Sequence, residues 1–257
     1  VIMTMLNQQS PRLAILGGGG MSKTSLAKAV LHHPETLIRF EHRFFISAES
    51  VTNSIDLAAL IGLHVGLKPG KDLTRSVVQY FVRKAPCLLV LDNLETAWEP
   101  IQDRGGVEEF LALLTDVEHL ALIIKICGAE RPAKVQWTHP FLLPLQPLSD
   151  EAAQETFLDI TDSAYGVEDI NQLLQLTDNM PLAVDLIAHL ADYKGPANVL
   201  ARLETERTSL LSVGHDRKSN LGVSISLPLS SPRITSNSQK LLSLLSILPN
   251  GLSDAEL

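Results

Sequence analysis

Lys23 and Thr24 are the residues of this chain that are best suited, by type and spacing, to chemistry on a phosphate group. They come two residues after four consecutive glycines, and the glycines follow an apolar run at residues 13–16. Glycines let backbone N–H groups point at a polyphosphate, a lysine neutralises the β and γ phosphates, and a threonine hydroxyl ligates Mg²⁺. The pattern therefore predicts a strand, a phosphate-binding loop, and a helix whose N-terminal dipole also faces the phosphates.

One residue departs from the phosphate-loop pattern G-x-x-x-x-G-K-[ST]. Ser22 stands immediately before Lys23, where the pattern has glycine. If the backbone there needs a positive φ, serine costs about 1–2 kcal/mol of strain, and its hydroxymethyl group crowds the phosphate. Because serine is small, we expect weakened nucleotide binding rather than none.

Asp92 is the second candidate for phosphate chemistry. It ends an apolar run at residues 87–91, as the Mg²⁺-holding aspartate ends a strand in P-loop NTPases. A buried strand that ends in aspartate can also be a simple capped turn, but the order and distance after the glycine loop favour the metal role. Hydrolysis needs a further acid to orient water, and Asn93 cannot act as a base. Glu95 is the remaining candidate for that catalytic role.

Short apolar runs and amphipathic stretches alternate through residues 1–148. The apolar runs predict strands at residues 13–16, 43–47, 87–91, 120–124 and 141–145. Between them, helical spacing of apolar residues predicts helices at residues 23–32, 54–65, 73–82 and 107–114. Such alternation predicts βαβ units, and right-handed crossovers then place helices on both faces of a parallel sheet. We predict an α/β P-loop nucleotide-binding domain over residues 1–148.

The pattern changes to helices alone after residue 148. Ser149 is a predicted N-cap, followed by helices at residues 152–160, 168–176, 181–193 and 196–211. We therefore predict a small helical domain over residues 149–211. Residues 212–257 read as a polar connector with one alternating segment at 223–229, then a helix at 240–248 and the start of another at 253–256.

Composition narrows the class of protein. The chain has 257 residues, 45% of them hydrophobic and 19% charged, and a net charge of −8. The negative charge argues against a broad electrostatic grip on nucleic acid or anionic lipid, and no apolar run approaches the roughly 18 residues that span a bilayer. Both cysteines, Cys87 and Cys127, fall in apolar runs. They predict buried thiols and a reducing, cytoplasmic location.

Three other residues invite a functional interpretation. Trp98 and Trp137 flank predicted strand ends, and we expect them to pack rather than to stack on a base. Arg131 follows the strand at 120–124, where it lies either near a nucleotide or, more commonly for a loop arginine, in solvent. The histidines have no spacing that predicts a metal site.

The chain resembles the NB-ARC branch of the STAND P-loop NTPases, the signalling ATPases of apoptotic activators, plant resistance proteins and Nod-like receptors. Four segments carry the resemblance, which extends over nearly the whole chain: GGGGMSKTSLA at 17–27, LLVLDNLE at 88–95, LIIKICG at 122–128 and NMPLAVDLIAHL at 179–190. The last is similar to the family's G-L-P-L-A motif, and LLSLLSILPNGLS at 241–253 resembles the start of its winged-helix domain. The sequences of the GGGGM loop and of the DNLET strand end are most similar to those of such receptors in filamentous and mushroom-forming fungi.

The resemblance implies a role for each matching residue. Lys23 would pair with the phosphates, Ser25 would touch the α-phosphate, and Pro181 would pack near the adenine. Thr24 and Asp92 would hold Mg²⁺. The complete nucleotide-binding set that it implies for ADP or ATP is Gly17, Gly18, Gly19, Gly20, Met21, Ser22, Lys23, Thr24, Ser25 and Pro181.

The segment LIIKICG departs from the family. The family usually has a threonine or serine and then an arginine that senses the γ-phosphate, and these places hold Lys125 and Cys127 here. Cysteine supplies no positive charge. Lys125 supplies one only from a shifted position, and we expect its side chain to be solvated instead. Together with Asn93, these residues predict eroded hydrolysis.

Two functions from different classes remain. In the first, the chain is a nucleotide-dependent switch in which ADP keeps a closed monomer and exchange for ATP allows a homo-oligomer. Its effector and sensor domains would lie outside this sequence, before Val1 and beyond Leu257. In the second, the fold is a non-catalytic scaffold that no longer binds nucleotide. An ordinary metabolic kinase is disfavoured because a helical domain follows the sheet and no acceptor-substrate site is found.

Overall fold

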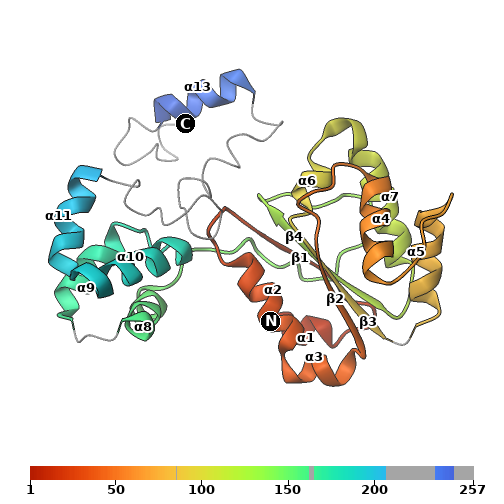
Figure 1. Cartoon of the computed structure of the whole chain (residues 1–257), viewed down its shortest axis with the longest axis horizontal. Helices are drawn as coiled ribbons and strands as arrows, with labels where there is room; N and C mark the ends of the chain where they lie inside the picture. The colour runs from red at the N-terminus through yellow and green to blue at the C-terminus, as the bar shows by residue number, and fades with distance from the viewer. Residues whose placement is uncertain (85, 162–164, 207–234, 246–257) are drawn as a thin grey trace.

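A parallel sheet forms the centre of the computed structural model, which describes residues 1–257 except 85, 162–164, 207–234 and 246–257 (Figure 1). Its four strands have the order β1-β4-β3-β2. The strands are β1 (Arg12–Gly17), β2 (His42–Ser47), β3 (Cys87–Asp92) and β4 (Leu120–Cys127). All neighbouring pairs are parallel, with Leu13 opposite Ile123 and Leu88 opposite Ala121. The predicted α/β fold is confirmed.

Helices cover both faces of this sheet. One face carries α1 (Ile2–Leu6), α2 (Lys23–His32) and α3 (Pro34–Arg39), and the other carries α4 (Ser54–His64), α5 (Leu73–Val82), α6 (Glu95–Trp98) and α7 (Ile101–Thr115) (Figure 1). The chain runs from β1 to the far edge and then returns through β3 to β4. Because right-handed crossovers in opposite directions use opposite faces, this order accounts for the two layers, and it places the reversal of strand order beside β1.

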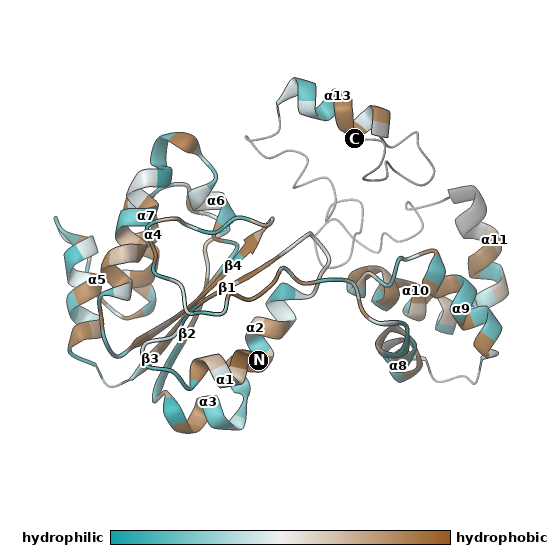
Figure 2. Ribbon diagram, turned by 180° about the vertical axis from the view of Figure 1, so that it is seen from behind, coloured by the Kyte–Doolittle hydropathy of each residue, from teal (hydrophilic) through white to brown (hydrophobic). Residues whose placement is uncertain are grey.

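Most residues of the central strands are apolar, and brown dominates these strands in Figure 2. Leu88 and Val90 pack with the α1–α3 layer, whereas Leu89 and Leu91 pack with the α4–α7 layer. The strand period of two residues sends alternate side chains to opposite layers. A strand in this position must therefore be a continuous apolar run, which is what the sequence of β3 shows.

The prediction of a strand at residues 141–145 is wrong. This segment runs beside β1 without forming a ladder: Thr138 N–H donates to Arg12 O at 3.0 Å and Leu145 N–H to Leu16 O at 2.8 Å. Pro140 and Pro144 have no N–H to donate, so the pairing cannot continue between these two bonds. The segment has the apolar residues of a strand but is irregular, and it lies along the edge of the sheet that β1 forms.

A second apolar core lies among the helices that follow residue 148. They are α8 (Asp150–Ile160), α9 (Val167–Gln175), α10 (Pro181–Lys194) and α11 (Pro196–Glu206), with α13 (Ser236–Leu245) further along the chain. Ser149 Oγ accepts the Ala152 N–H at 3.3 Å, so the predicted N-cap is confirmed. The predicted end of α11 beyond residue 206, the alternating segment at 223–229, and the residues at 246–248 and 253–256 lie outside the described residues. The bounds of the three predicted domains stay predictions.

Within the described part of the chain, no helix is both long enough and apolar enough to cross a membrane.

Candidate functional site

The loop between β1 and α2 has a left-handed backbone at two positions. Gly20 has φ +74°, and Ser22 has φ 51° and ψ 25° as the N-cap residue of α2. For a residue with a Cβ this conformation costs about 1–2 kcal/mol. The condition for strain at Ser22, a positive φ, is therefore met, while its side chain is exposed.

Replacing Ser22 with glycine should tighten nucleotide binding about tenfold, or ~1.4 kcal/mol. Glycine removes the hydroxymethyl group that would crowd the phosphate, and it adopts φ 51° without the Cβ penalty. Isothermal titration of ADP into both proteins measures the difference. Ser10→Gly is a matched control, since Ser10 has φ 47° at the opposite end of β1. Equal affinities for wild type and Ser22→Gly would show that the loop tolerates the side chain.

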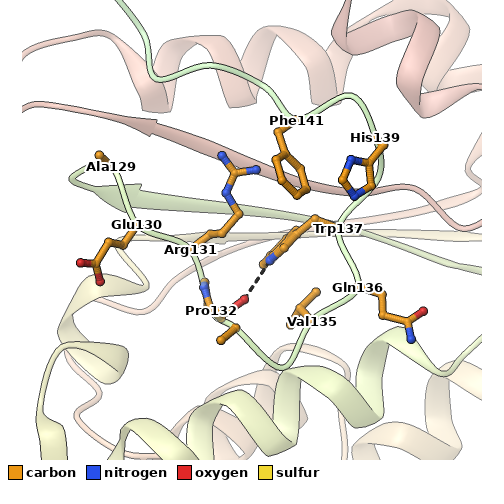
Figure 3. Close-up of a pocket in the computed structure, with 10 residues that line it drawn as sticks. Ala129, Glu130, Arg131, Pro132, Val135, Gln136, Trp137, His139 and Phe141 are labelled. Atoms are coloured by element: carbon orange, nitrogen blue, oxygen red, sulfur yellow. Dashed lines mark hydrogen bonds between the residues drawn. The ribbon is translucent and has the colours of Figure 1, made fainter.

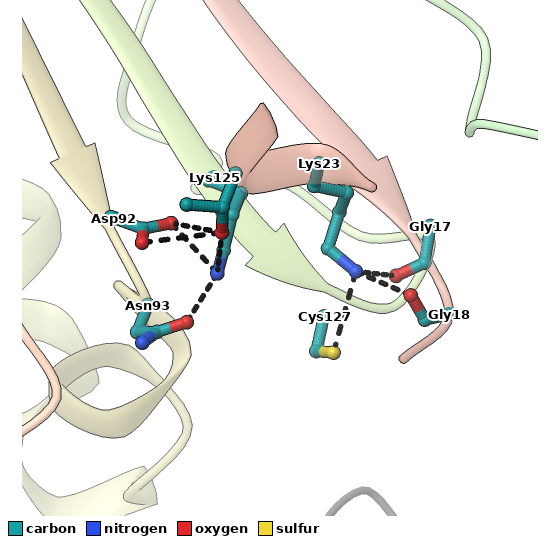
Figure 4. Close-up of polar contacts among 8 residues, drawn as sticks. Gly17, Gly18, Lys23, Asp92, Asn93, Lys125 and Cys127 are labelled. Carbon is teal, nitrogen blue, oxygen red and sulfur yellow. Dashed lines mark hydrogen bonds and ion pairs between the residues drawn. The ribbon is translucent and has the colours of Figure 1, made fainter. Parts of the chain in front are cut away.

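Lys23 is buried at the start of α2, with 6% of its surface exposed. Its ammonium donates to Gly17 O at 2.8 Å and to Gly18 O, and lies 3.5 Å from Cys127 Sγ (Figure 4). Burial lowers the pKa of Lys23 from its ordinary value, and the nearby Lys125 ammonium lowers it further, against the opposing effect of Cys127. The lysine is held by the carbonyls of its own loop, so a phosphate has to compete with these bonds.

A second lysine lies beside the predicted metal ligands, contrary to the expectation that Lys125 is solvated. Only 5% of its surface is exposed, and its Nζ is 2.7 Å from Asp92 Oδ1. The same ammonium donates to Thr24 Oγ1 at 3.2 Å and to Asn93 Oδ1 (Figure 4). Thr24 Oγ1 is 3.3 Å from both carboxylate oxygens of Asp92. The predicted Mg²⁺ ligands thus lie together, with a side-chain cation between them.

The sheet explains why Lys125 comes to this place. Lys125 and Ile123 point to the same face of β4, and Asp92 and Val90 point to that face of β3. The two strands are neighbours, and α2, which carries Thr24, covers that face. Parallel strands end at the same edge of a sheet, so the three side chains meet there.

The other residues expected to act in hydrolysis lie around this cluster. Glu95 is the first residue of α6, is 8% exposed, and is near enough to raise the pKa of Lys23. Asn93 follows β3 with φ 56° and accepts from Lys125. Cys127 ends β4 beside Lys23. The structure brings these residues to the loop, and their catalytic roles stay predictions.

The helical part of the chain contacts the loop directly. The N–H of Leu182 donates to Gly20 O at 3.1 Å. A Cβ at Gly20 would lie 3.0 Å from Met180 Sδ and 3.2 Å from Leu182 Cβ, so a side chain there would have to displace both neighbours by a few tenths of an ångström. Pro181, the first residue of α10, lies between these two contacts and is half-buried. The MPLA segment therefore lies beside the loop, and the adenine contact of Pro181 stays a prediction.

Arg131 is a half-buried loop residue that packs on an aromatic side chain, and its position relative to a nucleotide stays a prediction. It stacks on the ring of Phe141, with 4.1 Å between the guanidinium carbon and the ring centre, in a shallow pocket after β4 (Figure 3). Trp137 lines the same pocket and donates from Nε1 to Pro132 O at 2.8 Å, and Trp98 is fully buried. The prediction that both tryptophans pack is therefore confirmed.

Lys125 is the site residue that sequence reasoning misplaced. The signal was present, because this lysine interrupts an otherwise apolar strand between two isoleucines. A strand buried on both faces has no solvent for a charge, so such a lysine needs a buried acidic partner. Within the described residues no group of three or more histidine, cysteine or acidic side chains is arranged to hold a metal.

Solved structures share this fold, although no protein-family model and no curated protein sequence matches the chain. A Walker-type ATPase of Pyrococcus abyssi superposes with a TM-score of 0.60 and 12% identity over 99% of this chain and 84% of its own. Orc1 of Aeropyrum pernix, in complex with DNA, gives 0.57 and 16% over 98% and 70%. Cdc6p of Pyrobaculum aerophilum gives 0.56 and 16% over 74% of this chain and 59% of its own length.

These similarities establish the class of fold: the chain has the α/β fold of P-loop ATPases. At such low identity they establish the fold alone. The narrower resemblance to NB-ARC proteins is left to the sequence motifs. The Orc1 structure holds DNA, and the comparisons do not support the expectation that this chain has no nucleic-acid partner, which rests only on net charge.

Proposed function

We propose that the chain is an ADP- or ATP-binding signalling switch of the NB-ARC type, with slow hydrolysis or none. The observation that carries this proposal is the hydrogen bond from Leu182 N–H to Gly20 O. It joins the helical part of the chain to the loop that would receive the phosphates. A ligand that moves this peptide therefore biases how the two parts are docked, which is the coupling that a switch requires.

The ligand class follows from the loop. Left-handed residues at Gly20 and Ser22, the N-terminus of α2 and the buried Lys23 provide backbone N–H groups and positive charge in one place. Phosphates of a nucleotide fit this set of donors. In the proposed cycle, ADP holds the helical part against the loop, and exchange for ATP releases it for self-association.

Nucleotide binding is tested by the melting temperature with ADP or ATP. At a free nucleotide concentration of about 100 Kd, binding to the folded state alone should add roughly 2.7 kcal/mol to the free energy of unfolding. Gel filtration then separates the switch from simple binding: ADP should leave a monomer, and a non-hydrolysable ATP analogue should give a larger species. Identical elution with both nucleotides would retain binding and reject the switch.

The alternative function is a scaffold that binds no nucleotide, and one observation favours it. The Lys23 ammonium already bonds the carbonyls of Gly17 and Gly18, so the loop is closed by its own side chain. For a scaffold, neither ADP nor ATP would change the melting temperature at any concentration tried.

A further inference from the structure

We propose that this loop binds its nucleotide without a divalent cation, because the Lys125 ammonium holds the place between Thr24 and Asp92 where Mg²⁺ would bind. The proposal rests on the proposed function, since it describes how the same site receives a nucleotide. It assigns the ligand as a metal-free nucleoside diphosphate or triphosphate.

The ammonium of Lys125 has as many hydrogen-bond acceptors around it as it has hydrogens to donate. An ammonium has three hydrogens, and Lys125 has three acceptors, Asp92 Oδ1 at 2.7 Å, Thr24 Oγ1 at 3.2 Å and Asn93 Oδ1. Two of these acceptors, the Asp92 carboxylate and the Thr24 hydroxyl, are the side chains that the sequence predicts as Mg²⁺ ligands. The lysine therefore uses the oxygens that the ion would need.

The residues of this site do not fit a Mg²⁺ ion. Mg²⁺ requires an octahedron of oxygens at about 2.0–2.1 Å. The ammonium lies among those oxygens instead, and a divalent ion beside it would face a fixed positive charge in a buried place. Lys125 cannot easily withdraw, because it projects from β4 onto the face that α2 covers and its side chain is 6% exposed.

The three N–H groups of Lys125 are already bonded, but its charge can still replace part of the electrostatic role of the ion toward the phosphates. It lies close enough to Lys23 that its charge lowers the pKa of Lys23. Two side-chain cations thus flank the loop, one on α2 and one on β4. The positive charge that a P-loop protein usually takes from solution is here part of the chain, and Mg²⁺ that chelates ADP in solution competes with the site.

The test is a titration of wild-type protein with ADP, once in EDTA and once in excess MgCl₂. We expect the affinity in EDTA to equal or exceed that in MgCl₂. The Lys125→Thr variant frees Asp92 and Thr24, so it should bind ADP about tenfold more weakly in EDTA and regain affinity with MgCl₂. Lys134→Thr is the matched control, because Lys134 is an exposed lysine paired with Glu109 on the surface.

A second readout does not depend on affinity. Mn²⁺ in place of Mg²⁺, followed by electron paramagnetic resonance, should show an ion bound in the ADP complex of Lys125→Thr and none in that of wild type. If Lys125→Thr does not fold, Lys125→Met keeps the stem and removes the charge, and the two wild-type titrations decide by themselves.

The outcomes separate this proposal from the function it depends on. Wild-type binding that is tenfold or more tighter with MgCl₂ than in EDTA overturns the metal-free site and leaves nucleotide binding intact. Absence of binding in both solutions overturns nucleotide binding itself, and the metal-free site with it. Equal or tighter binding in EDTA, lost in Lys125→Thr and preserved in Lys134→Thr, supports the assignment.

Discussion

Lys23→Ala should abolish binding of ADP and ATP. Lys23 is the buried cation at the start of α2, within reach of the loop carbonyls Gly17 O and Gly18 O. Loss of charge-assisted hydrogen bonds at about 1.5–3 kcal/mol each lowers affinity by a hundredfold or more when two are removed. Because wild-type binding is already weakened by Ser22, the variant should give no measurable heat in isothermal titration at millimolar nucleotide.

Lys28→Ala is the control for this experiment. Lys28 lies on the same helix, one turn and one residue further on, and its side chain is exposed near the ring of Phe45. It should bind nucleotide as wild type does. Unfolding curves of both variants separate a lost ligand contact from a lost fold. If Lys23→Ala keeps wild-type affinity, the ligand is held elsewhere and the loop is not its site.

ATP hydrolysis should barely exceed the uncatalysed background, even at saturating nucleotide. Asn93 supplies no carboxylate, and Cys127 supplies no guanidinium beside Lys23. A charged arginine in this kind of transition state is worth roughly 10³-fold or more in rate. Lys125, the cation nearest Asp92, donates to three acceptors already, so it is a poor substitute for a mobile sensor of the γ-phosphate.

Phosphate release under saturating ATP, with and without Mg²⁺, measures this rate. Cys127→Arg alone should not restore turnover, because Asn93 and the Lys125–Asp92 pair remain. Several turnovers per minute that disappear in Lys23→Ala would contradict the prediction. Glu95, buried at the start of α6, would then be the first residue to replace in search of the base.

The loop and the strand that ends in Asp92 could be predicted from sequence because their signals are local. Glycines followed by Lys23 and Thr24 define a turn and a helix start within a few residues, and an apolar run defines a buried strand. The segment at 141–145 shows where this reasoning fails. Its apolar residues match a strand, but Pro144 removes a ladder hydrogen bond, and only the pairing partner reveals that consequence.

The environment of Lys125 could not be predicted in the same way. Its meeting with Asp92 and Thr24 depends on the order of the strands and on which helix covers that face. Those are properties of the assembled sheet, and no short segment of the sequence predicts them. The contact of Leu182 with Gly20 is of the same kind, since about 160 residues of chain lie between these positions by sequence number.

The loop after β1 is held by different parts of the chain at its start and further along. Gly17 exchanges both backbone hydrogen bonds with Gly128, and Leu16 O accepts from Leu145 N–H. The entrance of the loop is thus clamped into the sheet, whereas its exit is tied to α10 through Leu182. The loop is thus fixed to the sheet at one end and attached to a helix of the other part of the chain further along. In the proposed switch, a shift of the loop on ligand binding would therefore be passed to α2 and α10, while the sheet holds the start of the loop in place.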